Sequence, residues 1–217
     1  MMKRASVIVT LFFIALQAVY SQSAPLGKDL VRQFSEKMQT YKTIESEFSF
    51  TLENLQEGFS DTHDGELLLK GKKYNLNVMG MEVYFNGETK WQFIPEANEV
   101  TISKPTGLDG GFFDDPTQIF RDYEEDFKSR FVGEKVVRRE TYYEVDLYPE
   151  DLSAPYSIIK ITFKKQNLEP VSIKYTGKDG VNYIIEIKDF NPNITANDSK
   201  FTFNTSDYKD IMVVDLR

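Results

Sequence analysis

Histidine and paired acids are the side chains of this 217-residue chain that could carry out acid–base chemistry. His63 is the single histidine, and it stands beside Asp61 and Asp64 in a polar stretch. Catalytic bases are most often histidines, and a nucleophile usually needs such a base beside it, so one histidine offers little for a catalytic site. We interpret His63 as a solvent-exposed residue in a turn between strands.

Carboxylates can catalyse without histidine when two of them flank a bond, as in glycoside hydrolysis. Asp114 and Asp115 form such a pair by composition, and the segment 122–126 contains four acids. At helical spacing these acids line a solvated face or a helix N-terminus, where negative charge is favoured. A carboxylate enzyme stays an alternative, and it would require two acids that face each other in a cleft.

A calcium loop is the metal site that the acidic, glycine-rich segment 109–115 suggests. Calcium needs six or more oxygen ligands in ordered alternation, and Phe112 and Phe113 interrupt that order. The chain has no cysteine, which also excludes a thiolate metal site and a disulfide framework. We expect no catalytic residue, no metal and no cofactor.

The N-terminus has the layout of a secretory signal peptide. Lys3 and Arg4 precede an apolar stretch over 7–19, and small residues follow at 21–24. That stretch is shorter than the roughly 20 residues of a membrane-spanning helix. The sequence predicts a cleavable signal peptide over 1–23 and one mature domain over 24–217. Without a cysteine for lipidation, we expect export without a lipid anchor.

The mature chain is strongly acidic. Removing Lys3 and Arg4 from the 26 basic residues leaves 24 against 34 acids, a net charge of −10. Nucleic acids and anionic membrane surfaces repel such a chain. We therefore expect no nucleic-acid partner.

The spacing of apolar residues predicts one helix and many strands. Between Lys28 and Tyr41 they recur every three or four positions, which places them on one side of a helix. From Glu47 onward they recur every second position, as in strands with one buried face. The Asn86-Gly87 pair favours a tight hairpin within this series. At least nine antiparallel strands are implied, so we expect a large curved sheet or barrel.

A region of different character separates the two sets of strands. Asp115-Pro116 predicts the N-cap and first residue of a helix. That helix would place Ile119, Tyr123 and Phe127 on one face, with Phe131 near its edge. Large apolar side chains here either plug the core or form a movable lid over the sheet. The lid candidates are Leu108, Phe112, Phe113, Ile119, Phe120, Tyr123 and Phe127.

The hairpin Tyr84–Pro95 resembles that of the LolA family, the periplasmic outer-membrane lipoprotein carriers of Gram-negative bacteria. It has an apolar strand, an Asn-Gly turn, a tryptophan at Trp91, an aromatic residue and a proline, in the family's order. Residues 64–70 resemble the family's second strand, 115–117 the start of its lid helix, and 200–215 its closing strand and tail. The resemblance covers nearly all of the mature chain.

Two positions depart from the family pattern. The family often has glutamine two residues after the aromatic of its first strand, where this chain has Phe50. The family's Lys-Arg-Pro, whose arginine helps to hold the lid closed, is Lys70-Gly71-Lys72 here. An ammonium group at Lys72 or Lys73 does not reproduce a guanidinium fork, so we do not assign the arginine's role to either lysine.

The resemblance implies a mainly β fold with α: an incomplete antiparallel β-barrel, or strongly curved sheet, covered by a few helices that form a lid. It implies a periplasmic chaperone that holds lipoprotein acyl chains in an apolar cavity and shuttles them from the inner towards the outer membrane as a monomer. Its partners would be acylated lipoproteins, the inner-membrane lipoprotein-releasing ABC transporter and an outer-membrane acceptor. The candidates for the cavity lining are Phe48, Phe50, Leu52, Leu67, Leu69, Leu76, Val78, Met81, Val83, Phe85, Trp91 and Phe93.

The alternative function is a non-enzymatic sensor or structural module on a related β fold, which recognises a periplasmic protein or a glycolipid. A closed apolar cavity would favour the carrier. A core packed solid, with Phe112 and Phe113 inside it, would favour the alternative.

Overall fold

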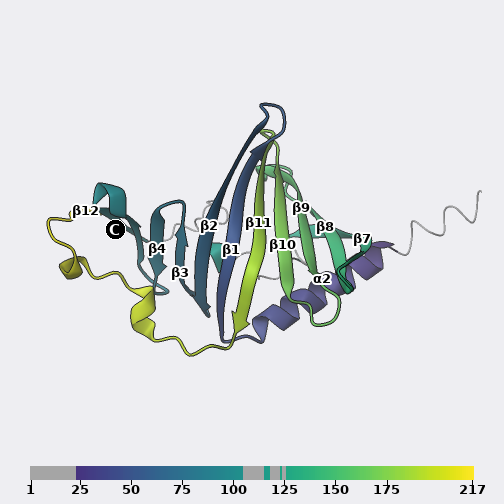
Figure 1. Ribbon diagram of the computed structural model, residues 1–217, viewed down its shortest axis with the longest axis horizontal. Coiled ribbons are helices and arrows are strands. Elements are labelled where there is room, and N and C mark those ends of the chain that lie inside the picture. The colour runs from purple at the N-terminus through teal and green to yellow at the C-terminus, as the bar shows by residue number, and fades with distance from the viewer. Residues whose placement is uncertain (1–22, 105–114, 118–122, 124–125) are drawn as a thin grey trace, which may run out of the picture.

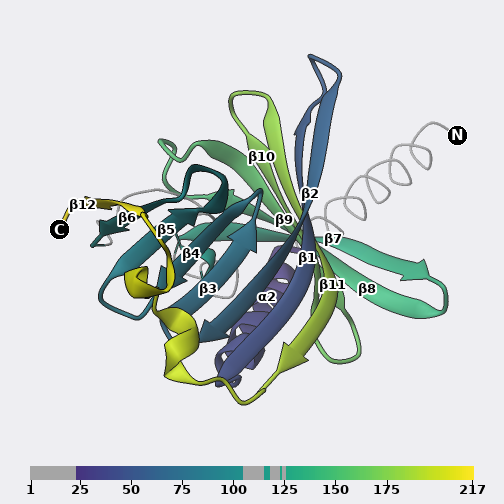
Figure 2. The same cartoon turned by 60° about the vertical axis from the view of Figure 1, so that its left-hand side comes forward.

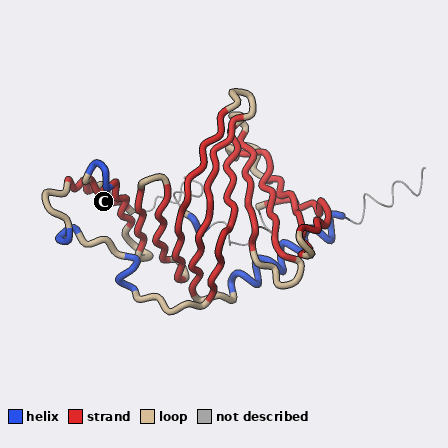
Figure 3. Tube along the Cα trace, in the orientation of Figure 1, coloured by secondary structure: helices blue, strands red, loops and turns tan. Residues whose placement is uncertain are grey.

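One long, curved β-sheet and one α-helix dominate the computed structural model, which describes residues 23–104, 115–117, 123 and 126–217 (Figure 1, Figure 3). The strand order is β12-β6-β5-β4-β3-β2-β1-β11-β10-β9-β8-β7, so β12 and β7 are the two edges of an open sheet. The expected mainly β fold, an incomplete barrel, is confirmed. The strands are β1 (Thr43–Asn54), β2 (Phe59–Lys70), β3 (Lys73–Val78), β4 (Met81–Phe85), β5 (Lys90–Ile94), β6 (Glu99–Ser103), β7 (Phe127–Val137), β8 (Glu140–Pro149), β9 (Tyr156–Lys164), β10 (Pro170–Gly177), β11 (Val181–Pro192) and β12 (Met212–Asp215).

Most neighbouring strands are consecutive in sequence and antiparallel, as their tight turns predict. Two pairings join distant parts of the chain. β1 pairs with β11 and so connects the two sets of strands, while β12 runs parallel to β6, which the expectation of antiparallel strands did not include. The described chain has 12 strands, where the sequence implied at least nine.

The helix α2 (Ser23–Gln39) packs against one face of the sheet, which we name the inner face (Figure 2). Leu30, Val31, Phe34 and Met38 are buried, which confirms the predicted spacing, although the helix begins at Ser23, five residues before the predicted start. Within the described ranges, no helix is both long and apolar enough to cross a membrane. The predicted signal peptide lies outside the described residues, except for Ser23.

The opposite face, named the outer face, is crossed by the segment that links β11 to β12. This segment, residues 193–211, is named the C-terminal strap and contains the short 3-10 helices η3 (Asp198–Phe201) and η4 (Thr205–Asp207). It runs below the ends of β1 to β4 and then turns towards β12 at the edge of the sheet (Figure 1). Phe203 of the strap joins Phe93 and Val100 of the sheet in a second, smaller apolar cluster.

The predicted helix after Asp115-Pro116 does not extend to Phe127 and Phe131. Both residues lie in β7, where Phe127 pairs with Pro149 and Phe131 with Val145. Residues four apart share a face in a strand as well as in a helix, so their spacing could not separate the two structures. The Asp115 carboxylate does accept a hydrogen bond from the backbone N–H of Thr117, as an N-cap does.

Candidate functional site

The inner face is a continuous apolar surface. Ten of the twelve cavity candidates lie on it, because direct cross-strand partners share a face: Ile44 pairs with Leu69, Leu67 with Leu76, and Leu76 with Val83. Seven of the ten are buried in the main core and three are only partly buried. The buried residues are Phe48, Phe50, Leu67, Leu69, Leu76, Val78 and Val83, and the partly buried ones are Leu52, Met81 and Phe85.

Trp91 and Phe93, the other two candidates, face the outer side. Tyr84 pairs with Trp91, whereas the inner-face residue Val83 pairs with Gln92. The rings of Phe93 and Phe203 are 4.9 Å apart between centroids, so the strap covers these residues. The alternation predicted the strand correctly, but not the face that this strand buries, which depends on the distant strap.

The lid candidates are only partly described. Leu108, Phe112, Phe113, Ile119 and Phe120 lie outside the described residues. Tyr123 and Phe127 are buried in the inner-face core, with their ring centroids 5.6 Å apart in an edge-to-face arrangement. Their burial fits either a core plug or a closed lid.

Part of the inner face is incompletely covered by the described chain. Leu52, Tyr183 and Tyr175 form one row across β1, β11 and β10, and each is half-buried. Tyr156 adjoins the row, with its ring centroid 5.6 Å from that of Tyr175. We name these four residues the rim. Their large side chains supply apolar surface that a ligand could cover.

His63 lies within strand β2, not in a turn as predicted. Its Nε2 atom is 2.9 Å from the Asp61 carboxylate, and both side chains are partly exposed. It pairs across the strands with Phe50, on the inner face. In the described parts of the chain, no three or more histidine, aspartate or glutamate side chains are arranged to hold a metal ion.

Two lysines of β2 and β3 hold the strap to the sheet. The Nζ atoms of Lys70 and Lys73 each lie 2.7 Å from the Asp198 carboxylate, and Lys70 also donates to the carbonyl of Ala196. These hydrogen bonds lower the pKa of Asp198 to about 2. Lys72, the other candidate for the family arginine's role, is exposed in the turn between the two strands.

Replacing Asp198 by asparagine should loosen the strap. The pKa of Asp198 is lower in the folded than in the unfolded chain. The stability that its ionised carboxylate contributes is therefore present above about pH 4 and is lost as the pH falls towards 2. We expect Asp198→Asn to speed amide hydrogen exchange in the strap at pH 7, and high salt to do the same to the unmodified protein, since exposed pairs are screened. Asp207→Asn is the matched control, because the Asp207 carboxylate accepts a hydrogen bond from Asn204 within the strap. Equal exchange in both variants would contradict this role.

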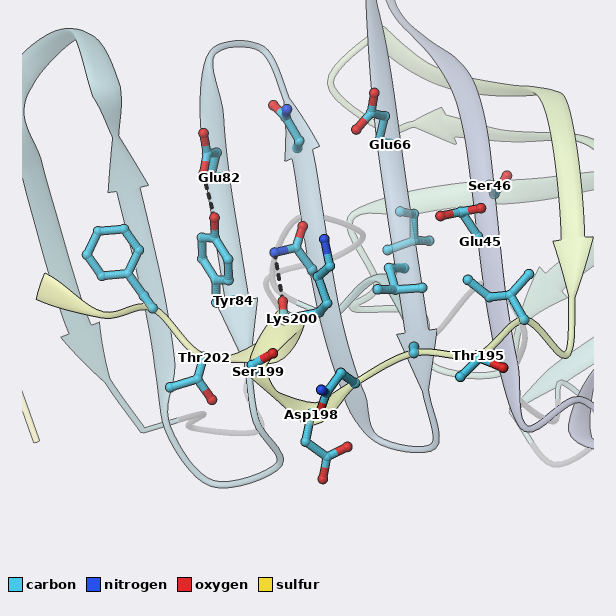
Figure 4. Close-up of a pocket in the computed structure, with 18 of the residues that line it drawn as sticks. Glu45, Ser46, Glu66, Glu82, Tyr84, Thr195, Asp198, Ser199, Lys200 and Thr202 are labelled. Carbon is cyan, nitrogen blue, oxygen red and sulfur yellow. Dashed lines mark hydrogen bonds between the residues drawn. The ribbon is translucent and has the colours of Figure 1, made fainter. Parts of the chain in front are cut away.

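A groove of about 1180 Å³ lies on the outer face between the strap and strands β1 to β4 (Figure 4). Its lining includes Tyr84, whose hydroxyl donates to Glu82 at 2.6 Å, and burial together with this bond raises the pKa of Tyr84. Among the described residues, seven acids line the groove against a single base, Lys200. The acids are Glu45, Glu47, Glu66, Glu82, Asp189, Asp198 and Asp207. The apolar pattern did not predict this surface, although several of its acids occupy the alternate positions of the same strands.

The sequence matches the family described as "Outer membrane lipoprotein carrier protein LolA" over residues 39–204. No curated protein sequence matches the chain significantly. An uncharacterized conserved protein from Thermus thermophilus has the same fold, with a TM-score of 0.57, 9% identity, and coverage of 85% of this chain and 98% of the other.

Two further solved structures align with lower TM-scores. A LolA superfamily protein from Nitrosomonas europaea aligns with a TM-score of 0.43 and 13% identity, over 82% of this chain and 97% of its own. LprF from Mycobacterium bovis aligns with a TM-score of 0.48 and 11% identity, over 81% of this chain and 98% of its own. The family match covers most of the chain, including the hairpin around Trp91. The chain belongs to the LolA family.

Proposed function

We propose that this protein is a periplasmic carrier of lipoproteins, which binds their acyl chains at the inner face and shuttles them from the inner towards the outer membrane. The proposal assigns residues 1–23 to a cleaved signal peptide and 24–217 to a monomeric carrier domain without a cofactor. Its partners would be acylated lipoproteins, an inner-membrane lipoprotein-releasing ABC transporter and an outer-membrane acceptor. Membership of the LolA family supports this assignment.

The observation that carries the proposal is the continuous apolar inner face with its half-buried rim. Apolar residues follow one another across the sheet from Val83 in β4 to Leu147 in β8. Each methylene that leaves water contributes about 0.8 kcal/mol, so a broad apolar surface can hold acyl chains without any catalytic chemistry. At the rim, Leu52, Tyr175 and Tyr183 still have surface to bury.

The experiment has two parts. Native mass spectrometry of the protein purified from periplasm should detect a lipid or an acylated protein bound to it. Titration with a synthetic dipalmitoylated peptide should show saturable binding, and Leu52→Asn should weaken it about tenfold by removing apolar rim surface. Thr51→Asn is the matched control, because Thr51 is the neighbouring residue on the outer face, where its hydroxyl contacts that of Thr62.

The alternative is a non-enzymatic sensor or structural module that recognises a periplasmic protein or a glycolipid. It is favoured by the tight packing beneath α2, where Phe34 and Phe163 are fully buried and their ring centroids are 5.2 Å apart. If the protein carries no lipid and does not bind the dipalmitoylated peptide, the carrier proposal is wrong and this alternative stands.

A further inference from the structure

The outer groove lies on the face of the sheet opposite the apolar surface that the carrier proposal uses. Its lining combines seven acids with apolar side chains such as Leu68, Ile194 and Phe203, from both the sheet and the strap. We propose that this groove binds a basic, extended peptide segment of a protein partner. The site is independent of the inner face, so it goes beyond the carrier function.

Three acids of the groove carry negative charge that the described chain does not pair. The side chains of Glu45, Glu47 and Glu66 are exposed and line the groove, and no hydrogen bond or ion pair to their carboxylates is present in the described part of the chain. Glu47 and Glu66 are direct cross-strand partners, an arrangement in which like charges repel. A cationic ligand would relieve that repulsion.

Three of the lysines near the groove contact other acids, and Lys200 is the one base among the described lining residues. Lys70 and Lys73 contact Asp198, and Lys188 contacts Asp64. Figure 4 shows Asp198 directed away from Glu45 and Glu66, on the other side of the strap. The protein therefore neutralises Asp198 itself, and Lys200 alone cannot balance Glu45, Glu47 and Glu66, which leaves net negative charge for an external cation.

Geometry indicates the kind of cation. Glu45 and Glu47 are two residues apart on β1, so their side chains recur at about 7 Å on one face. Alternate side chains of an extended peptide recur at the same spacing, which lets lysine or arginine at every second position meet successive acids. Asn77 and Asn197, which also line the groove, provide carboxamides for the peptide backbone.

A single metal ion does not fit this arrangement. A cation such as calcium needs several oxygen ligands gathered around one point. The described residues contain no such cluster, because the acids are spread along separate strands and the strap. The groove instead suits a ligand with several separate positive charges.

The test uses the exported protein and a fluorescent peptide of five Lys-Ser repeats, with five Glu-Ser repeats as the control probe. The basic peptide should bind saturably, and its amide shift perturbations should map to β1, β2 and the strap. The triple variant Glu45→Gln, Glu47→Gln, Glu66→Gln should weaken binding about tenfold, since three exposed ion pairs are lost. Thr195→Trp, which fills the groove without changing charge, should weaken it as well.

The matched control is Glu57→Gln, Glu88→Gln, Glu96→Gln, which changes the net charge equally at exposed residues outside the groove. It should change affinity less than twofold. Equal loss in both triple variants would reduce the effect to general electrostatic attraction and overturn the proposal, as would undiminished binding in Thr195→Trp or tight binding of calcium alone. Dipalmitoylated peptide binding should be unchanged in the groove variants, so the two proposals can fail separately.

Discussion

Replacing Phe34 by alanine should destabilise the fold by about 3–5 kcal/mol, the usual cost of removing a buried phenylalanine from a core. Phe34 is fully buried on α2, and its ring stacks on that of Phe163 in β9. The helix packs mainly on β7, and the Phe34 ring extends that contact to β9, so both strands belong to the second half of the chain. Since domains are stable by only about 5–15 kcal/mol, this single change should remove a large share of the total.

The free energy of unfolding is measured by urea titration, which is monitored with two probes. Far-UV circular dichroism reports the whole fold, and fluorescence of Trp91, the single tryptophan, reports the outer cluster. Leu26→Ala is the matched control on the same helix, because Leu26 is 44% exposed and its loss should cost less than about 0.5 kcal/mol. A loss below about 1 kcal/mol in Phe34→Ala would show that α2 contributes little to the stability of the sheet. Separate midpoints for the two probes would show that the outer cluster unfolds independently.

The elements that periodicity predicted well are those with one buried face and no competing contact. In α2 the residues of the apolar stripe are buried, and in β1 the alternation of Phe48 and Phe50 with polar neighbours gives the inner face directly. The local turn at Asn86-Gly87 also joins the predicted strands, and the Asn86 carboxamide accepts bonds from the backbone of Glu88 and Thr89. Local chemistry was sufficient for these elements.

The errors about buried faces and strand ends concern contacts that are distant in sequence. On the outer face Phe93 is buried and Trp91 is partly buried, because Phe203 and Tyr208, more than 100 residues later in the chain, pack against this cluster. Phe127 is a strand residue because it pairs with Pro149 in β8. Neither partner could be inferred from the spacing of the residues themselves.

The outer groove was missed for a different reason. In the sequence, Glu45, Glu47 and Glu66 occupy the alternate positions of two amphipathic strands that face solvent. This is the usual place of charged residues in such strands. They line a groove only because β1 and β2 pair in one register and the strap crosses beside them. Sequence alternation indicates which residues point away from the core, but not which other segment of the chain packs over them.

Gly65 is the position where the second large effect is expected. A Cβ atom at Gly65 would lie 2.5 Å from Cζ and 2.7 Å from Cε2 of Phe48, and 3.0 Å from the carbonyl oxygen of Asn77. Phe48 is buried, so its ring has little room to move. Gly65→Ala should therefore cost about 1–3 kcal/mol through overpacking, and chemical denaturation measures this directly.

Phe48→Leu provides the test of cause, because it shortens the side chain that the new methyl group would meet. In the double variant the cost of Gly65→Ala should shrink by roughly 0.5–3 kcal/mol, the coupling expected of residues in direct contact. Gly71→Ala is the control: its φ of 58° makes alanine unfavourable, yet no atom lies within 4 Å of the added Cβ. Its cost should persist in the Phe48→Leu background, since backbone strain does not depend on that ring. Equal rescue of both glycine variants would mean that Phe48→Leu acts through the unfolded chain, and the steric explanation would fail. Rescue of Gly65→Ala alone would establish that the absence of a Cβ atom at Gly65 makes room for the Phe48 ring.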